Sequence, residues 1–69
     1  MIKEKPVLLT LLQTEEKVGL TKQTIYRLMR AGRFPRSAKV GRWAVWVERE
    51  VDEWIQEQVD NNRYAPREK

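Results

Sequence analysis

The absence of cysteine and histidine constrains this chain more than any motif it contains. With 69 residues it has room for one domain around one hydrophobic core, and neither a disulfide nor a thiolate metal site can support that core. Stability must come from packing, for which three tryptophans, two tyrosines and one phenylalanine supply large apolar groups. Because the usual thiol nucleophile and the commonest general base are also missing, we expect no enzyme, no metal site and no cofactor.

Charge is segregated along the chain. Eight basic residues and no acidic residue lie between Lys17 and Val47, a segment charge of +8. Between Glu48 and Asp60 there are six acidic residues and one arginine, a charge of −5. A basic segment of this density is typical of a protein that binds a polyanion, although charge alone also fits ordinary solvated helices.

The two ends of the chain bear on its organisation. The apolar stretch from Val7 to Leu12 is too short for a signal-peptide core or a membrane span, so we expect a cytoplasmic protein without membrane contact. The C-terminal end is polar and contains Pro66. We therefore predict one domain over residues 7–60 and a flexible tail over residues 61–69.

Capping signals predict a short first helix over residues 11–18. Thr10 and Gln13 have the spacing of a capping box, in which each side chain accepts a hydrogen bond from the backbone of the other. Gly19 suits the left-handed position that ends such a helix.

A second helix is predicted over residues 22–31. Thr21 is a good N-cap for it, and Gly32 provides the C-terminal stop. Its apolar face is formed by Ile25, Leu28 and Met29. The opposite face carries a contiguous polar and basic stripe, which consists of Lys22, Gln23, Tyr26, Arg27 and Arg30.

After Pro35 the pattern changes to strand, turn and strand, because the residue before proline is pushed toward an extended conformation. Gly41 and Arg42 form the expected two-residue turn of type II′, between strands over residues 38–40 and 43–47. The second strand has apolar residues on both faces, so the pattern does not decide which face lies inward, and one tryptophan near the tip can be exposed.

A third helix is predicted from Glu48 to the Asn61-Asn62 pair. Its apolar stripe is formed by Val51, Trp54, Ile55 and Val59. Acidic residues in its first turn complement the positive end of the helix dipole. Trp46 and Trp54 lie within apolar stripes, so we interpret both as core residues.

Two helices joined by a glycine turn, then a hairpin and a third helix, form the order of a winged helix-turn-helix domain: a mostly α fold with a small β-hairpin. In this scaffold the second helix enters the major groove of double-stranded DNA, and the hairpin, the wing, touches the adjacent minor groove or phosphates. The acidic third helix must face away. The predicted DNA-binding residues are Thr21, Lys22, Gln23, Thr24, Tyr26, Arg27, Arg30 and Arg42.

The run from Val18 to Pro35, followed by Val40-Gly41-Arg42, Trp46 and Glu50-Val51-Asp52-Glu53-Trp54, resembles the AlpA-type phage and prophage regulators. These are excisionase-like members of the MerR-like winged-helix group. The resemblance implies sequence-specific DNA binding, either to control nearby prophage genes or to act as an excisionase with a phage integrase as partner.

Carried over by position, the family's T-x-Y-R segment falls on Thr24, Tyr26 and Arg27, its G-x-F-P turn on Gly32, Phe34 and Pro35, and its wing on Gly41 and Arg42. The chain departs from the family pattern in the first helix, where Thr14 and Lys17 replace apolar residues, and this predicts weaker packing of that helix. Its hairpin is also about one residue shorter than the common family form, and Val45 stands where a basic residue is frequent.

Alternative interpretations remain open at several positions. Tyr26 can contact DNA or pack partly in the core, and Arg33, Arg36 and Lys39 can be contacts or ordinary solvated charge. The alternative function is a protein-interaction module, such as an antirepressor or an inhibitor of another regulator, that uses the acidic helix and the tail. Because the sequence shows no heptad seam or extra dimer helix, we expect a monomer in solution that binds DNA cooperatively.

Overall fold

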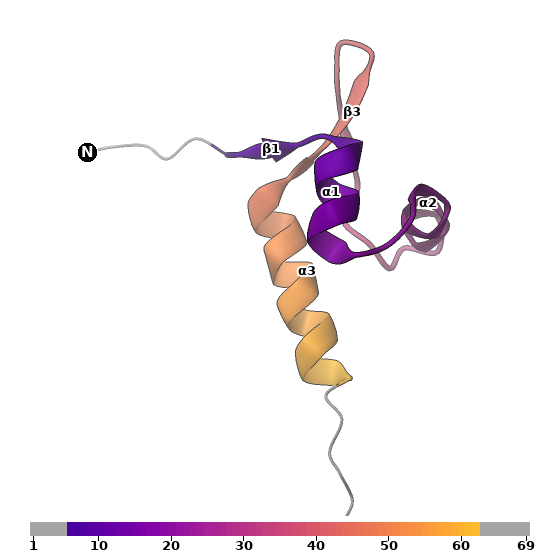
Figure 1. Cartoon of the computed structure of the whole chain (residues 1–69), viewed down its shortest axis with the longest axis vertical. Helices are drawn as coiled ribbons and strands as arrows, with labels where there is room; N and C mark the ends of the chain where they lie inside the picture. The colour runs from indigo at the N-terminus through magenta and orange to yellow at the C-terminus, as the bar shows by residue number, and fades with distance from the viewer. Residues whose placement is uncertain (1–5, 63–69) are drawn as a thin grey trace, which may run out of the picture.

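The computed structural model describes residues 6–62, which form a winged helix-turn-helix (Figure 1). It contains three helices and a small antiparallel sheet whose hairpin projects beyond the helices, in agreement with the predicted fold class. The predicted tail lies outside the described residues from position 63 onward. In chain order the elements are β1 (Leu8–Leu9), α1 (Leu11–Val18), α2 (Lys22–Arg30), β2 (Ala38–Val40), β3 (Trp43–Val47) and α3 (Glu48–Asn61).

The first helix, α1, begins and ends where the sequence predicts. The Thr10 hydroxyl accepts a hydrogen bond from the Gln13 amide at 3.1 Å, and the Gln13 side chain accepts one from the Thr10 amide at 2.9 Å. This confirms the capping box. Gly19 has a φ of +73°, so the left-handed end of the helix is confirmed as well.

The second helix, α2, is held at both ends by local hydrogen bonds. The Thr21 hydroxyl accepts from the Thr24 amide at 3.3 Å. At the other end Gly32, with a φ of +73°, donates to the Met29 carbonyl, and the Arg33 amide donates to the Leu28 carbonyl. These two bonds define a Schellman motif, which ends α2 one residue earlier than predicted.

The sheet contains a strand that the sequence analysis did not predict. β3 lies in the centre, between β1 and β2, and both pairings are antiparallel. Leu8 pairs with Val47 and Leu9 with Trp46, and the Glu48 amide continues the pairing by donating to the Val7 carbonyl at 2.7 Å. β1 therefore fastens the N-terminal end of the domain to the strand that leads into α3.

The hairpin of β2 and β3 has the predicted two-residue turn. Val40 pairs with Trp43, which leaves Gly41 and Arg42 as the turn residues. Gly41 has a φ of +62°, and no residue other than glycine has a positive φ within residues 6–62. A positive φ at the first turn position alone distinguishes type II′ from type I′, so the predicted turn type is confirmed.

The core lies where β3 meets the three helices. Its fully buried apolar side chains are Trp46 of β3, Ile25 of α2 and Val51 of α3, joined by Leu9 and Phe34. The sequence left open which face of β3 is inward, and the structure buries Trp46 while leaving Trp43 68% exposed. Trp54 is partly buried and packs against the same core. Trp46 and Trp54 are therefore core residues, as predicted.

The two departures of α1 from the family pattern have different surroundings. Thr14 is fully buried, and its hydroxyl has no hydrogen-bond partner within residues 6–62. Lys17 instead lies near the surface and forms ion pairs with Asp52 at 3.0 Å and Glu48 at 3.4 Å, both in α3. The helix α1 thus contains an unsatisfied buried hydroxyl, and a partly exposed ion-pair cluster joins it to α3.

Candidate nucleic-acid interface

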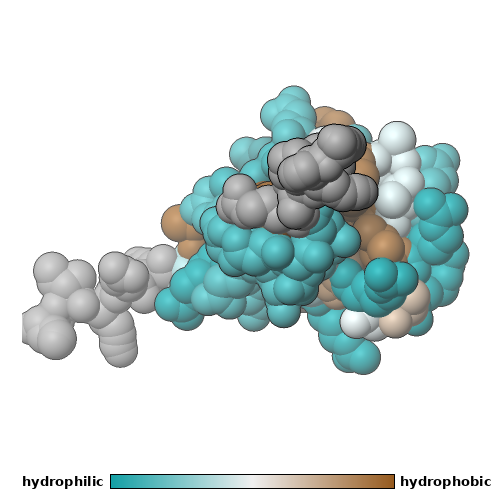
Figure 2. Space-filling view, turned by 90° about the horizontal axis from the view of Figure 1, so that it is seen from below, coloured by the Kyte–Doolittle hydropathy of each residue, from teal (hydrophilic) through white to brown (hydrophobic). Residues whose placement is uncertain are grey.

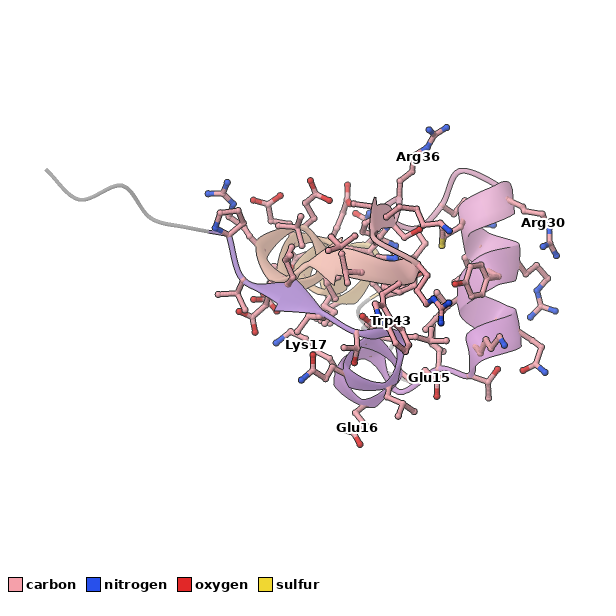
Figure 3. All side chains as sticks on the ribbon, turned by 90° about the horizontal axis from the view of Figure 1, so that it is seen from above. Glu15, Glu16, Lys17, Arg30, Arg36 and Trp43 are labelled. Carbon is pink, nitrogen blue, oxygen red and sulfur yellow. The ribbon has the colours of Figure 1, made fainter. Side chains whose placement is uncertain are left out.

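The outer face of α2 exposes most of the residues predicted to read DNA. The exposed side chains along this face are Lys22, Gln23, Arg27 and Arg30, with the N-cap Thr21 exposed at its start. Arg30 projects from α2 away from the rest of the molecule (Figure 3). Within residues 6–62 none of the three cations of this face forms an ion pair. They are therefore available to an external anion.

Thr24 and Tyr26 differ from the other predicted α2 residues because both are half-buried. The Thr24 hydroxyl accepts a hydrogen bond from the Thr21 hydroxyl at 3.0 Å, which ties it into the N-terminal cap. The Tyr26 ring packs edge-to-face on Trp46, with 6.2 Å between ring centroids. Tyr26 thus has a packing role and also borders the surface.

The N-terminal end of α2 has an electrostatic character suited to anions. Its first turn contains no acidic residue, and its last turn contains Arg27 and Arg30. The last-turn arginines complement the negative end of the helix dipole, whereas Lys22 adds charge to the positive end. The helix thus keeps a positive end beside Thr21, an arrangement that favours a phosphate there.

The loop after α2 is fixed by two indole groups. Trp54 of α3 donates its ring N–H to the Arg33 carbonyl at 2.7 Å, and Trp46 of β3 donates to the Pro35 carbonyl at 3.1 Å. Phe34, between these two carbonyls, is buried and packs edge-to-face on Trp54 with centroids 4.7 Å apart. Because the loop connects α2 to β2, these contacts fix the helix relative to the wing.

Not every cation of the basic segment lies on the same face. Arg36 points away from the domain in a different direction from Arg30, on the side of the molecule remote from α1 (Figure 3). Lys17, at the start of the segment, is paired with α3. The basic segment therefore divides into the α2 stripe, the wing and outlying charges.

The wing tip carries Arg42, the remaining predicted site residue, which is exposed and without an ion pair in the described part of the chain. Between the wing and the N-terminal end of α1 lies a groove of about 720 Å³, which we call the α1–wing groove. Tyr26 of α2 also lines it. The groove therefore joins α2 to the wing, the two elements predicted to touch DNA.

Three residues of the α1–wing groove were not among the predicted site residues: Leu12, Lys39 and Trp43. Leu12 is 69% exposed, although the sequence offered it as part of an apolar run. The sequence alone does not separate Leu12 from Leu11, because adjacent residues can share one apolar face of a helix, as Leu28 and Met29 do in α2. For Trp43 the signal was its position beside the turn.

The opposite region of the molecule is acidic. The exposed acidic residues of α3 include Glu50, Glu53 and Glu57, which border a polar cleft of about 400 Å³ against the loop after α2. Seen from the α3 end, the surface is mostly hydrophilic (Figure 2). An acidic surface repels phosphates, so a duplex bound to α2 must leave α3 on its far side.

One of three comparisons with known proteins identifies a family for this chain. No helix within residues 6–62 is long and apolar enough to cross a membrane, and no group of acidic side chains in that range has the geometry of a metal site. Comparison with curated proteins and with solved structures finds no match. The family model described as "Prophage CP4-57 regulatory protein (AlpA)" matches residues 7–59. The chain therefore belongs to the AlpA family of phage regulatory proteins.

Proposed function

We propose that this protein binds double-stranded DNA at specific sequences and thereby regulates phage or prophage genes. The observation that carries the proposal is the exposed stripe of α2, whose cations have no partner within residues 6–62 and lie on a helix fixed to the core by Ile25. Such a helix can enter the major groove without rearrangement of the domain.

The side chains of the stripe divide by chemistry into base readers and phosphate contacts. Gln23 can pair with adenine N6 and N7, and Arg27 and Arg30 can pair with guanine O6 and N7. Thr21 and Lys22, at the positive end of α2, suit phosphate contacts that set the register.

Two further groups complete the assigned interface. Thr24 and Tyr26 lie at the border of α2 with the core, where each can add a contact to the backbone of the duplex. Arg42 at the wing tip meets the adjacent minor groove or its phosphates.

DNA binding of this kind can serve two roles. In the first, the protein occupies a promoter and acts as a transcriptional regulator. In the second, it bends attachment-site DNA as an excisionase and works with a phage integrase. The same recognition helix serves both roles, and a monomer that binds tandem sites cooperatively would produce bent complexes.

A gel-shift titration against tiled DNA from around its own gene tests the proposal, with a salt series and circularly permuted probes. We expect one or more fragments to outcompete random DNA, and the logarithm of the affinity to fall linearly with the logarithm of salt concentration. Bent complexes at an attachment site indicate an excisionase, and binding at a promoter alone indicates a transcriptional regulator. If no fragment outcompetes random DNA, the proposal is wrong and an interaction module that uses the acidic α3 becomes the better hypothesis.

A further inference from the structure

The α1–wing groove combines apolar side chains with cations, and no acidic residue of the described range 6–62 lines it. Leu12 and Trp43 are among the most exposed large apolar side chains within residues 6–62, at 69% and 68%. Lys39 and Arg42 line the same groove. Neither cation forms an ion pair in the part of the chain that the structure describes. The groove therefore presents exposed apolar side chains together with positive charge.

The hairpin register places Lys39 at the groove. Lys39 lies directly opposite Ala44, which also lines the groove, so their side chains share one face of the hairpin. Trp43 pairs with Val40 and therefore starts from the other face, but it lies next to the turn, lines the groove as well and is seen between the hairpin and α1 in Figure 3. The type II′ turn places Arg42 beside Trp43 at the tip.

The groove lies between the two elements that contact DNA in the proposed function. Tyr26 lines it from α2, and Arg42 lines it from the wing. A duplex that places its major groove on α2 and its adjacent minor groove on the wing has one sugar–phosphate strand between those two grooves. That strand must cross the α1–wing groove.

We propose that the α1–wing groove holds this sugar–phosphate strand, with Trp43 and Leu12 against the deoxyribose rings and Lys39 and Arg42 on the flanking phosphates. The inference rests on the proposed function and assigns Leu12, Lys39 and Trp43 to the same interface. A deoxyribose presents apolar carbon atoms between two anionic phosphates, which matches the alternation of apolar and cationic groups in the groove. Contacts of this kind position the duplex and carry no sequence information.

Two features of the groove favour DNA over a protein segment as its occupant: the charge of its lining residues and its continuity with the surface of α2. Among the described residues no acidic side chain lines the groove, and its surface continues onto α2 through Tyr26. Lysine is depleted at protein–protein interfaces, so Lys39 in the groove favours a polyanion over an apolar protein segment.

Tryptophan fluorescence in the full chain tests the proposal, because the three indoles differ in exposure. Trp46 is fully buried and Trp54 is half-buried, so acrylamide quenching reports mainly on Trp43. We expect saturating cognate duplex to reduce quenching to the level seen in a Trp43→Phe variant. Unchanged quenching while fluorescence anisotropy of labelled DNA shows a complex would overturn the groove assignment and leave the proposed function intact.

A Trp43→Ala variant supplies the second measurement, with Val59→Ala as the matched control. Val59 is also an exposed apolar residue, but it lies on α3. We expect Trp43→Ala to weaken binding about tenfold for cognate and scrambled duplexes alike, because a backbone contact is lost. Val59→Ala should bind as the unaltered protein does.

Each other result of the binding measurement decides whether the α1–wing groove holds DNA. Equal affinities for Trp43→Ala and the unaltered protein would overturn the inference and leave the groove to a protein partner. A loss confined to one base position would also overturn it, because that result identifies base readout. If the unaltered protein binds no duplex at all, the proposed function fails and this inference fails with it. Should Trp43→Ala not fold, the quenching measurement on the unaltered chain still decides.

Discussion

The helices α2 and α3 each bury one apolar side chain completely, Ile25 in α2 and Val51 in α3, and both contact α1. Their solvent faces are opposite in charge. The first turn of α2 has no acidic residue and its last turn has two arginines, whereas α3 has acidic residues in its first turn and no basic residue in its last. The inward residues thus determine the fold, and the outward residues determine which macromolecule each helix can approach.

The largest expected effect is a loss of stability when the fully buried side chain of either helix, Ile25 in α2 or Val51 in α3, is truncated. Ile25→Ala should lower the free energy of unfolding by about 2 to 5 kcal/mol, because it leaves a cavity in the core that Ile25 shares with Trp46, and the chain has no cysteine to form a disulfide. Val51→Ala should cost about 2 kcal/mol for the same reason. Urea unfolding followed by circular dichroism measures both. A loss well below 1 kcal/mol in either variant would show that its helix is not anchored as described.

The next largest effect is on DNA binding, and it distinguishes the solvent face of α2 from that of α3. Arg27→Ala should cost about 1 to 3 kcal/mol of specific binding if the guanidinium reads a base, and it should relax the preference at one base position. Glu57→Ala on the exposed face of α3 is the matched control and should leave binding unchanged or slightly stronger. Competition gel shifts with single-base variants of the site measure both. An unchanged preference in Arg27→Ala would remove that residue from the base readers.

A smaller effect concerns α1, the helix between the two. Thr14→Val keeps the side-chain shape and removes the unbonded buried hydroxyl, so it should raise the free energy of unfolding by about 1 kcal/mol. Neither outward face changes, so DNA affinity should stay the same. A thermal melt and one titration suffice. If the variant is less stable, the hydroxyl has a partner in solution that the structure does not show.

The smallest effect concerns the ion pairs from α1 to α3. The hydrogen bond with Asp52 raises the pKa of Lys17 above its ordinary value of 10.5. Because the pKa of Lys17 is raised in the folded state, the ion pairs stabilise the fold at pH values below 10.5. This stabilisation is lost as the pH rises through the raised pKa of the folded state. Lys17→Met should therefore melt slightly earlier than the unaltered protein at neutral pH and low salt. The difference should disappear at high salt or strongly alkaline pH, and a difference that persists in both would assign it to packing.

Local signals in the sequence were enough to predict most elements. Thr10, Gly19 and Thr21 act within one turn of the chain, so their roles as caps could be inferred from spacing alone. The Gly41 turn is local in the same sense. The end of α2 was predicted one residue too late because the Schellman motif places its glycine one position beyond the capping residue Ala31.

The features that could not be predicted depend on long-range contacts. β1 is two residues long, and its pairing of Leu9 with Trp46 joins positions 37 residues apart, which no local pattern reveals. Whether Trp43 or Trp46 is buried depends on which face of β3 meets the helices, and both faces are apolar. The α1–wing groove exists only after α1 and the wing are brought together, so Leu12 and Lys39 could not be assigned to it beforehand.

The most direct test of the central claim is a nuclear magnetic resonance titration of the isotope-labelled 69-residue chain with its cognate duplex. The comparison of the two helices predicts large backbone shifts at Gln23, Arg27 and Arg30 of α2 and at Arg42 of the wing. It predicts small shifts along the exposed residues of α3. Large shifts confined to α3, with α2 and the wing unchanged, would contradict the account.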